Sequence, residues 1–188
     1  MARQSNNHVM KGTRGMIGKQ IVFKVRKGKQ ILAAPPYIDE ERVPTPNQLA
    51  AQDRFKFASE YANAAIKDAG LKAEYQKVAS KRQSAQNMAF KDAYNPPGVL
   101  NIITQGYTGA VGNIIVVHAV DDFKVTSVNV SILNESGKII EAGNAFSDKH
   151  GVVWVYTVTV VNSNVRGCKI VATAADLPGN EDVMESFL

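Results

Sequence analysis

Apolar residues fall at every second position in the segment "KQIVFKVRKGKQILAAPP", both before and after Lys27-Gly28. A period of two on either side of a glycine-containing turn predicts a β-hairpin that ends at Pro35-Pro36. An isolated two-stranded hairpin is only marginally stable in water. We therefore expect this hairpin to pack on the helices that follow it or on another subunit.

The apolar spacing then changes to three and four residues, which predicts two helices before residue 98. Thr45 and Pro46 have the N-cap and first-turn chemistry that begins a helix, and Gly70 is expected to end it. The second helix is expected from Leu71 to the "NPPG" segment, with a break near Gln83-Ser84 where the apolar period lapses.

The C-terminal half consists of β-branched runs separated by turn residues, which is typical of a β-sandwich. The runs are "VGNIIVVHAVDD", "FKVTSVNVSILN", "GKIIEAG", "GVVWVYTVTVVN" and "RGCKIVATAAD". The chain is therefore expected to be α+β. Its expected parts are a flexible basic arm over 1–16, a β-hairpin plus helices over 17–98, a linker over 99–111 and a sandwich over 112–188.

Two resemblances cover most of the chain. Residues 113–180 resemble a bacterial immunoglobulin-like sandwich through "GVVWVYTVT" and "CKIVATAADLPGN", which contain a Trp-x-Tyr pair and an "ATAxDxxGN" ending. The segment "GMIGKQIVFKVRKGKQILAAPP" followed by "TPNQLAAQDRFKFA" is similar to uncharacterised small bacterial and phage-type proteins. The first resemblance implies an antiparallel immunoglobulin-like sandwich and a role in adhesion or assembly, and the second implies no function. Neither implies a catalytic residue.

Composition narrows the possible functions. The chain has 188 residues, 45% of them hydrophobic, and a single cysteine, Cys168, which excludes a disulfide framework and a cysteine-based zinc cluster. Neither a signal peptide nor a membrane span is evident, so the expected location is the cytoplasm, an assembled particle or an extracellular filament.

Charge is distributed unevenly along the chain. Residues 1–38 hold eight basic residues and no acid, residues 39–98 hold nine basic and eight acidic residues, and residues 99–188 hold five basic and nine acidic residues. The net charges of these segments are therefore +8, +1 and −4, which agree with the total of +5. The molecule is thus basic at its N-terminal end and mildly acidic at its C-terminal end.

The glycine-rich segment from Gly12 to Gly18 superficially resembles a phosphate-binding loop. A P-loop has four residues between its glycines and a Ser or Thr after its lysine, whereas this segment has five residues there and Gln20 in the hydroxyl position. A strand-like run follows, so no helix N-terminus would face a phosphate. We expect the glycines to let the chain bend into the hairpin, and we expect no cofactor.

The basic residues of this region are the candidate site. They could contact a neighbouring copy or bind nucleic-acid phosphates, or they could simply form the solvated face of the hairpin. The candidates are Arg14, Lys19, Lys24, Arg26, Lys27 and Lys29.

Catalytic and metal chemistry have little support in the sequence. The three histidines lie far apart, and no nucleophile–base spacing is recognisable. Acidic turn residues could gather at the sandwich ends as a calcium site, but no Asp-x-Asp-x-Asp-Gly loop is present and we expect no metal. These residues are Asp121, Asp122, Asp148, Asp176, Glu181 and Asp182.

These patterns favour a structural protein over an enzyme. The leading hypothesis is a self-assembling subunit of a filament, phage particle or surface appendage, in which the N-terminal hairpin docks on a neighbouring copy. The alternative is a basic accessory protein that binds nucleic acid without sequence preference. The expected partners are further copies of the chain or nucleic acid, and no small-molecule substrate is expected.

Overall fold

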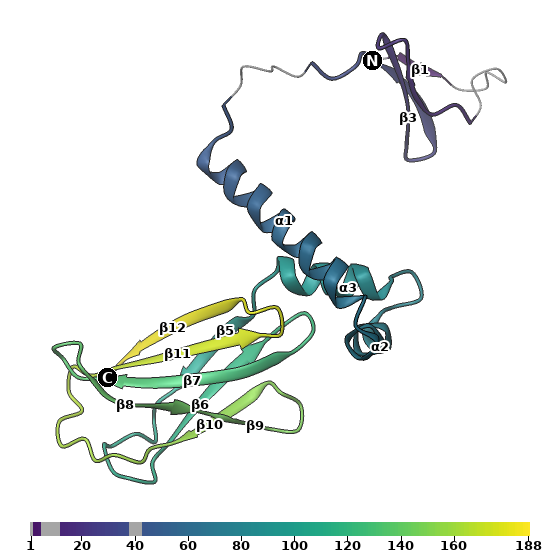
Figure 1. Ribbon diagram of the computed structural model, residues 1–188. Coiled ribbons are helices and arrows are strands. Elements are labelled where there is room, and N and C mark those ends of the chain that lie inside the picture. Colours follow the sequence, from purple (N-terminus) through teal and green to yellow (C-terminus); the bar gives the residue numbers. More distant parts are fainter. Residues whose placement is uncertain (1, 5–11, 38–42) are drawn as a thin grey trace. The chain divides into compact units, whose positions relative to one another are not determined.

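The structure is a computed structural model that describes residues 2–4, 12–37 and 43–188. Within these residues the fold is α+β, with three helices and three antiparallel sheets of four strands each (Figure 1). The chain divides into two compact units, Met1–Thr45 and Pro46–Leu188. The helices therefore belong to the same unit as the C-terminal sheets and not, as expected for 17–98, to that of the hairpin.

The N-terminal unit is a four-stranded sheet in the order β1-β4-β3-β2. Its strands are β1 (Ala2–Gln4), β2 (Gly15–Ile17), β3 (Ile21–Arg26) and β4 (Lys29–Ala33). The predicted hairpin is confirmed as β3 and β4. The expected flexible arm is corrected where it is described, because residues 2–4 and 15–17 pair with the hairpin as extra strands. Two further parts of the arm, residue 1 and residues 5–11, lie outside the described residues.

The turn between β3 and β4 contains only Lys27 and Gly28, since Arg26 pairs directly with Lys29. Both turn residues have a positive φ, 50° for Lys27 and 73° for Gly28. Two central residues with positive φ define the type I′ turn, whose twist matches that of the flanking strands. The predicted glycine turn is therefore present, with Lys27 in the first central position, where Asn and Asp are preferred.

Three helices begin the second unit: α1 (Pro46–Ala65), α2 (Ala69–Val78) and α3 (Ala85–Tyr94). The predicted break near Gln83-Ser84 is confirmed, because the Ser84 side chain caps α3 by accepting a bond from the backbone of Asn87. The expected end at Gly70 is wrong. Asp68 caps a new helix through the backbone of Leu71, so Gly70 lies inside the first turn of α2.

Two sheets form the rest of this unit. One has the order β5-β6-β10-β9 and the other the order β12-β11-β7-β8. The first contains β5 (Gly98–Ile103), β6 (Ile114–Val120), β10 (Val153–Thr157) and β9 (Phe146–Ser147). The second contains β12 (Glu181–Phe187), β11 (Lys169–Asp176), β7 (Val125–Leu133) and β8 (Ile139–Asn144).

The inner faces of the two sheets share one apolar core. Trp154 and Tyr156, at alternate positions of β10, are buried in it, and Cys168 is buried as well. The expected linker over 99–111 is corrected, because most of β5 lies within it and Val99 and Ile102 are part of the core. Burial of these side chains is what fixes the segment against β6.

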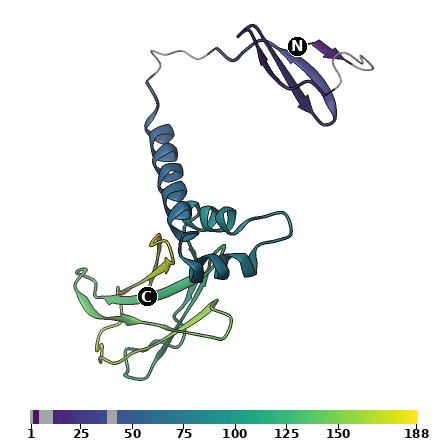
Figure 2. The ribbon, with the colours of Figure 1, turned by 45° about the vertical axis from the view of Figure 1, so that its right-hand side comes forward.

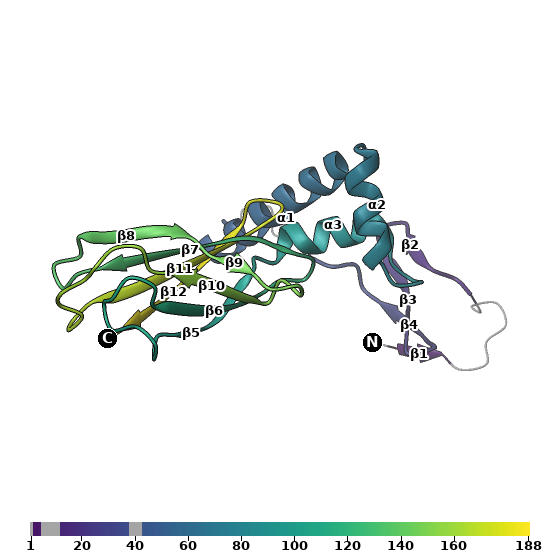
Figure 3. The same ribbon diagram turned by 90° about the horizontal axis from the view of Figure 1, so that it is seen from below.

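The helices lie at one end of the two-sheet body (Figure 3), and α1 and α3 lie side by side (Figure 2). The ring of Phe123, just before β7, packs on Tyr75 of α2 with centroids 4.4 Å apart. The Asn180 side chain donates to the backbone carbonyl of Ala93 in α3 at 3.3 Å. These contacts join the helices to the loops at the end of the sheets.

Among the described residues, no helix is both long enough and apolar enough to span a bilayer.

Candidate functional site

The N-terminal sheet has one apolar face. Side chains directly opposite each other in a sheet, and those two positions apart along a strand, lie on the same face. Ile17 pairs with Ile21, and Phe23 pairs with Leu32, so these residues share a face with Val25. The other described side chain on this face is that of Gln30. The described part of this face therefore carries no charge.

This face is open within its own unit. Ile17, Ile21 and Val25 are exposed by 64%, 42% and 40%, and Phe23 and Leu32 are only partly buried. None of residues 12–37 and 43–45 is fully buried. The sheet therefore has a continuous apolar surface but, in its described part, no core of its own.

The opposite face carries the basic residues of the sheet. Lys24, Arg26 and Lys29 lie on it beside the apolar side chains of Met16, Val22, Ile31 and Ala33, and Arg26 lies directly across from Lys29. Like charges at directly opposite positions repel each other, so this pair weakens the hairpin unless an anion lies near it. The sequence supplies no acidic residue between residues 1 and 38, so the described part of this unit offers no carboxylate partner.

The six predicted basic residues do not form a single cluster. Lys19 and Lys27 lie in the turns before and after β3, at opposite ends of the strand, and Arg14 precedes β2. All six side chains are exposed. The structure thus places three of the six on one sheet face and the other three at its margins, where they extend the positive surface.

A second surface, which sequence reasoning missed, lies on the outer face of β12. Residues that pair with the outward positions of β11 are Glu181, Val183, Glu185 and Phe187. Val183 and Phe187 are exposed by 54% and 74%, and the Glu185 carboxylate pairs with Lys169 at 2.9 Å. Along "EDVMESF" neither set of alternate positions is uniformly apolar, so this strand has only a weak local signal.

The acidic residues named as a possible calcium site mostly have other partners. Asp122 accepts bonds from Lys91 at 2.7 Å and Asn95 at 2.6 Å, which hold its pKa below its usual value despite partial burial. Asp182 accepts from the backbone of Val99 at 2.8 Å. Asp148 accepts backbone bonds within its own turn.

Asp121 and Asp176 do come together, and they are joined by Asp92 of α3, which the sequence analysis did not single out. One ligand atom from each of the three lies within 4.8 Å of one from each of the others.

Comparisons with known proteins add little. No protein-family model matches the chain, and no curated protein matches it. Among solved structures, the crystal structure of an engineered protein aligns with 52% of this chain and 22% of its own, with 18% sequence identity and a TM-score of 0.33. A superposition this loose identifies neither a family nor a function.

Proposed function

We propose that the protein is a non-catalytic, self-assembling structural subunit of a filament, phage particle or surface appendage. The observation that carries this proposal is the open apolar face of the N-terminal sheet, formed by Ile17, Ile21, Phe23, Val25 and Leu32. A sheet that is hydrophobic on one face must bury that face against another element. Association supplies that packing, because burial of apolar surface is its main driving force.

The proposed occupant of this face is a second copy of the chain. The described part of the N-terminal unit has no acid, whereas residues 99–188 carry nine acids against five basic residues. The outer face of β12 combines exposed Val183 and Phe187 with Glu181 and Glu185, so it offers both apolar and acidic contacts. The basic residues that could meet these acids are Lys19 and Lys27, in the turns at the two ends of β3 and at the margins of the apolar face. Charge complementarity of this kind orients a contact and suppresses like-to-like pairing. Repetition of a head-to-tail contact of this kind generates a ring or a filament.

The C-terminal sheets support an immunoglobulin-like module in this role. Labelled A, B, C, C′, D, E, F and G in chain order, strands β5 to β12 have the orders A-B-E-D and G-F-C-C′ in the two sheets. The first order, and G-F-C in the second, are those of an immunoglobulin constant domain, with C′ added beside C. The chain departs from antibody domains in having a single cysteine, and in carrying Trp154 on strand E rather than C.

Sedimentation analysis of the full chain over a range of protein concentrations tests the proposal. We expect concentration-dependent association that is strongest at low salt, and electron microscopy should show the assembled form. The double substitution Ile17→Thr and Ile21→Thr keeps β-forming residues while it removes apolar surface. It should weaken association at least about tenfold, the effect of a loss of about 1.4 kcal/mol.

The matched control is the double substitution Met16→Thr and Val22→Thr, a directly opposed pair on the other face of the same two strands. We expect the control to retain most of the association. A wild-type chain that stays monomeric at high concentration and low salt contradicts the proposal. So does equal loss in both double variants, because the apolar face would then have no special role.

Nucleic-acid binding is the second candidate function. It is favoured because Lys24, Arg26 and Lys29 lie on one face, and the described part of their unit contains no carboxylate that could pair with them. Such a face binds phosphates in a salt-dependent, sequence-independent way. Gel shifts with duplex DNA at two salt concentrations test it. Glutamate substitutions of the three residues should abolish the shift, whereas Ile17→Thr with Ile21→Thr should retain it. Absence of any shift at low salt rejects this candidate.

A further inference from the structure

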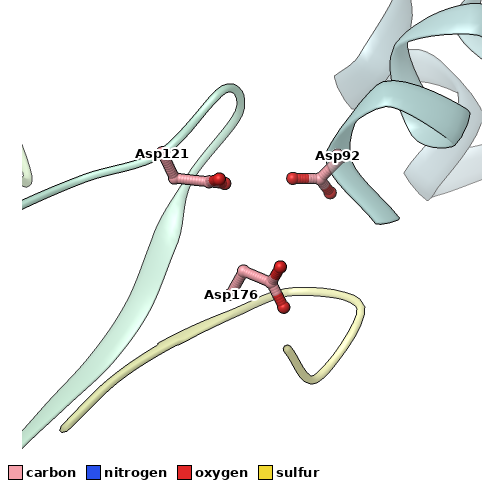
Figure 4. A group of neighbouring side chains, drawn as sticks. All are labelled: Asp92, Asp121 and Asp176. Carbon is pink, nitrogen blue, oxygen red and sulfur yellow. The ribbon is translucent and has the colours of Figure 1, made fainter. Parts of the chain in front are cut away.

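Three carboxylates converge where the helices meet the end of the two sheets (Figure 4). Asp92 comes from the last turns of α3, Asp121 follows β6 directly, and Asp176 is the last residue of β11. Asp92 is fully buried, and Asp176 is exposed by only 4%. Neither of the two ion pairs among the described residues involves any of the three.

Two of these carboxylates have an oxygen without a partner. Asp92 Oδ2 accepts a bond of 2.5 Å from the Tyr75 hydroxyl, but its Oδ1 is buried with no hydrogen-bond partner. Asp121 Oδ2 accepts from the backbone of Phe123 and Lys124, and its Oδ1 is likewise buried without a partner. A buried oxygen that accepts no hydrogen bond is costly, and an ion bound between them would satisfy both oxygens.

The rest of the local structure holds the three side chains in place. The Tyr75 hydroxyl gives its one proton to Asp92, so Tyr61, whose oxygen lies 2.9 Å from that of Tyr75, must donate to Tyr75. Asp176 accepts from the backbone of Gly179 and Asn180 and from the Asn180 side chain, at 2.6 to 2.8 Å. Figure 4 shows the Asp92 carboxyl directed toward Asp121 and Asp176. The set is therefore oriented before any ligand binds.

Three carboxylates whose oxygens lie within 4.8 Å of one another repel, and a cation bound among them would relieve this accumulation of negative charge.

We propose that Asp92, Asp121 and Asp176 bind a hard divalent cation such as Ca²⁺, which ties α3 to the end of the sandwich. Hard cations prefer carboxylate oxygens, and two oxygens on one Ca²⁺ lie at most about 5 Å apart, twice the Ca–O distance of about 2.3–2.6 Å. The mutual distances of up to 4.8 Å in this cluster meet that condition. This site is independent of the apolar face of the N-terminal sheet.

Metal titration of the full, chelator-treated chain tests the proposal. Ca²⁺, Mg²⁺ and Mn²⁺ are compared by calorimetry and by thermal unfolding, and Tb³⁺ serves as a luminescent substitute for Ca²⁺. We expect one ion per chain, an unfolding temperature that rises with ion concentration, and Tb³⁺ emission excited through Tyr75, which contacts the ligand Asp92.

The variants are Asp92→Asn and Asp121→Asn. Each removes one charged ligand and should weaken binding at least about tenfold. The amide introduced by Asp121→Asn keeps an oxygen for the turn bonds from residues 123 and 124, so this variant decides the question if Asp92→Asn fails to fold. The matched control is Asp122→Asn, which removes the same charge one position away from Asp121 and should bind as tightly as wild type.

The proposal is overturned if none of the three divalent ions gives binding heat or raises the unfolding temperature. It is also overturned if Asp121→Asn binds as tightly as wild type. In either case the three carboxylates would not form a cation site.

Discussion

The hydroxyl of Tyr156 on β10 donates a hydrogen bond of 2.7 Å to Oε1 of Glu141 on β8, which joins the two sheets through the core. Both residues are buried, with exposures of 5% and 6%. The same oxygen accepts bonds from the backbone and the hydroxyl of Thr159, at 2.6 and 2.7 Å. Gly143 makes room for the ring, because a Cβ there would lie 3.0 Å from Tyr156 Cε2. A buried carboxylate is tolerated here because these donors replace water.

Replacement of Glu141 by Gln should destabilise the fold by about 1–3 kcal/mol, because a neutral amide accepts these bonds more weakly and turns an N–H group toward other donors. Tyr156→Phe should cost about 1–2 kcal/mol, since it removes one of the bonds. Urea unfolding followed by the fluorescence of buried Trp154 measures both effects. The control is Glu185→Gln, which breaks the exposed pair with Lys169 and should cost less than about 1 kcal/mol. Equal losses in Glu141→Gln and Glu185→Gln would contradict the structural role of Glu141.

The stability of the fold should depend on pH through the same carboxylate. Burial alone would raise the pKa of Glu141, but bonds from Tyr156, Thr159 and Val160 hold it below its usual value of 4.5. A group with a lowered folded-state pKa binds its proton more readily when unfolded. Its contribution is therefore fully present above about pH 4.5, near the unfolded-state value, and is lost as the pH falls through the folded-state value. Unfolding free energies of wild type and Glu141→Gln, measured from neutral pH downward, should converge in acid. A constant difference would contradict the assignment.

Sequence patterns correctly predicted those features that depend on residues close together in the chain. The hairpin turn at Lys27-Gly28 and the break before Ser84 are both where the sequence indicates. Strand β5 was missed because it begins at the glycine of the "NPPG" stop, and β12 because neither of its faces is uniformly apolar. Both strands depend on pairing with residues distant in sequence, which a local period does not reveal.

The acidic cluster could not be predicted from the sequence for a different reason. Asp92, Asp121 and Asp176 are separated by 29 and 55 positions, so no spacing rule connects them. A weak local signal exists, because Asp92 lies three and four positions after Ala89 and Met88, on the buried stripe of α3. A carboxylate on an apolar helical stripe needs a partner in the fold. The sequence can thus suggest that Asp92 is unusual, but only the packing of α3 on the sheet loops shows its neighbours.

Replacement of Lys27 by Asn should stabilise the N-terminal hairpin by about 0.5–1 kcal/mol. Lys27 has φ 50° in a two-residue turn, and Asn adopts this left-handed region more readily than Lys does. Hydrogen exchange of the β3 and β4 amides measures the effect as slower exchange. Lys27→Gln is the control, because it removes the same charge from the neighbourhood of Arg26 and Lys29 without the preference of Asn for positive φ. Equal protection in both variants would assign the gain to charge and not to backbone conformation.

Alanine substitutions at Gly109 and Gly112 allow the energetic cost of backbone strain to be separated from that of disrupted close packing. Both have a strongly positive φ, 87° and 86°, so alanine carries a similar conformational cost of about 1 kcal/mol at either position. Around Gly112 a Cβ would meet nothing within 4 Å, but at Gly109 it would overlap the carbonyl oxygen of Asn162. Gly109 also accepts a bond from the backbone of Asn162 at 2.8 Å, so the two loops cannot separate without losing it. Gly109→Ala should therefore lose about 2 kcal/mol or more beyond Gly112→Ala in urea unfolding. Equal losses would show that the loop at Asn162 gives way, and that the close approach contributes nothing to the stability of the sandwich.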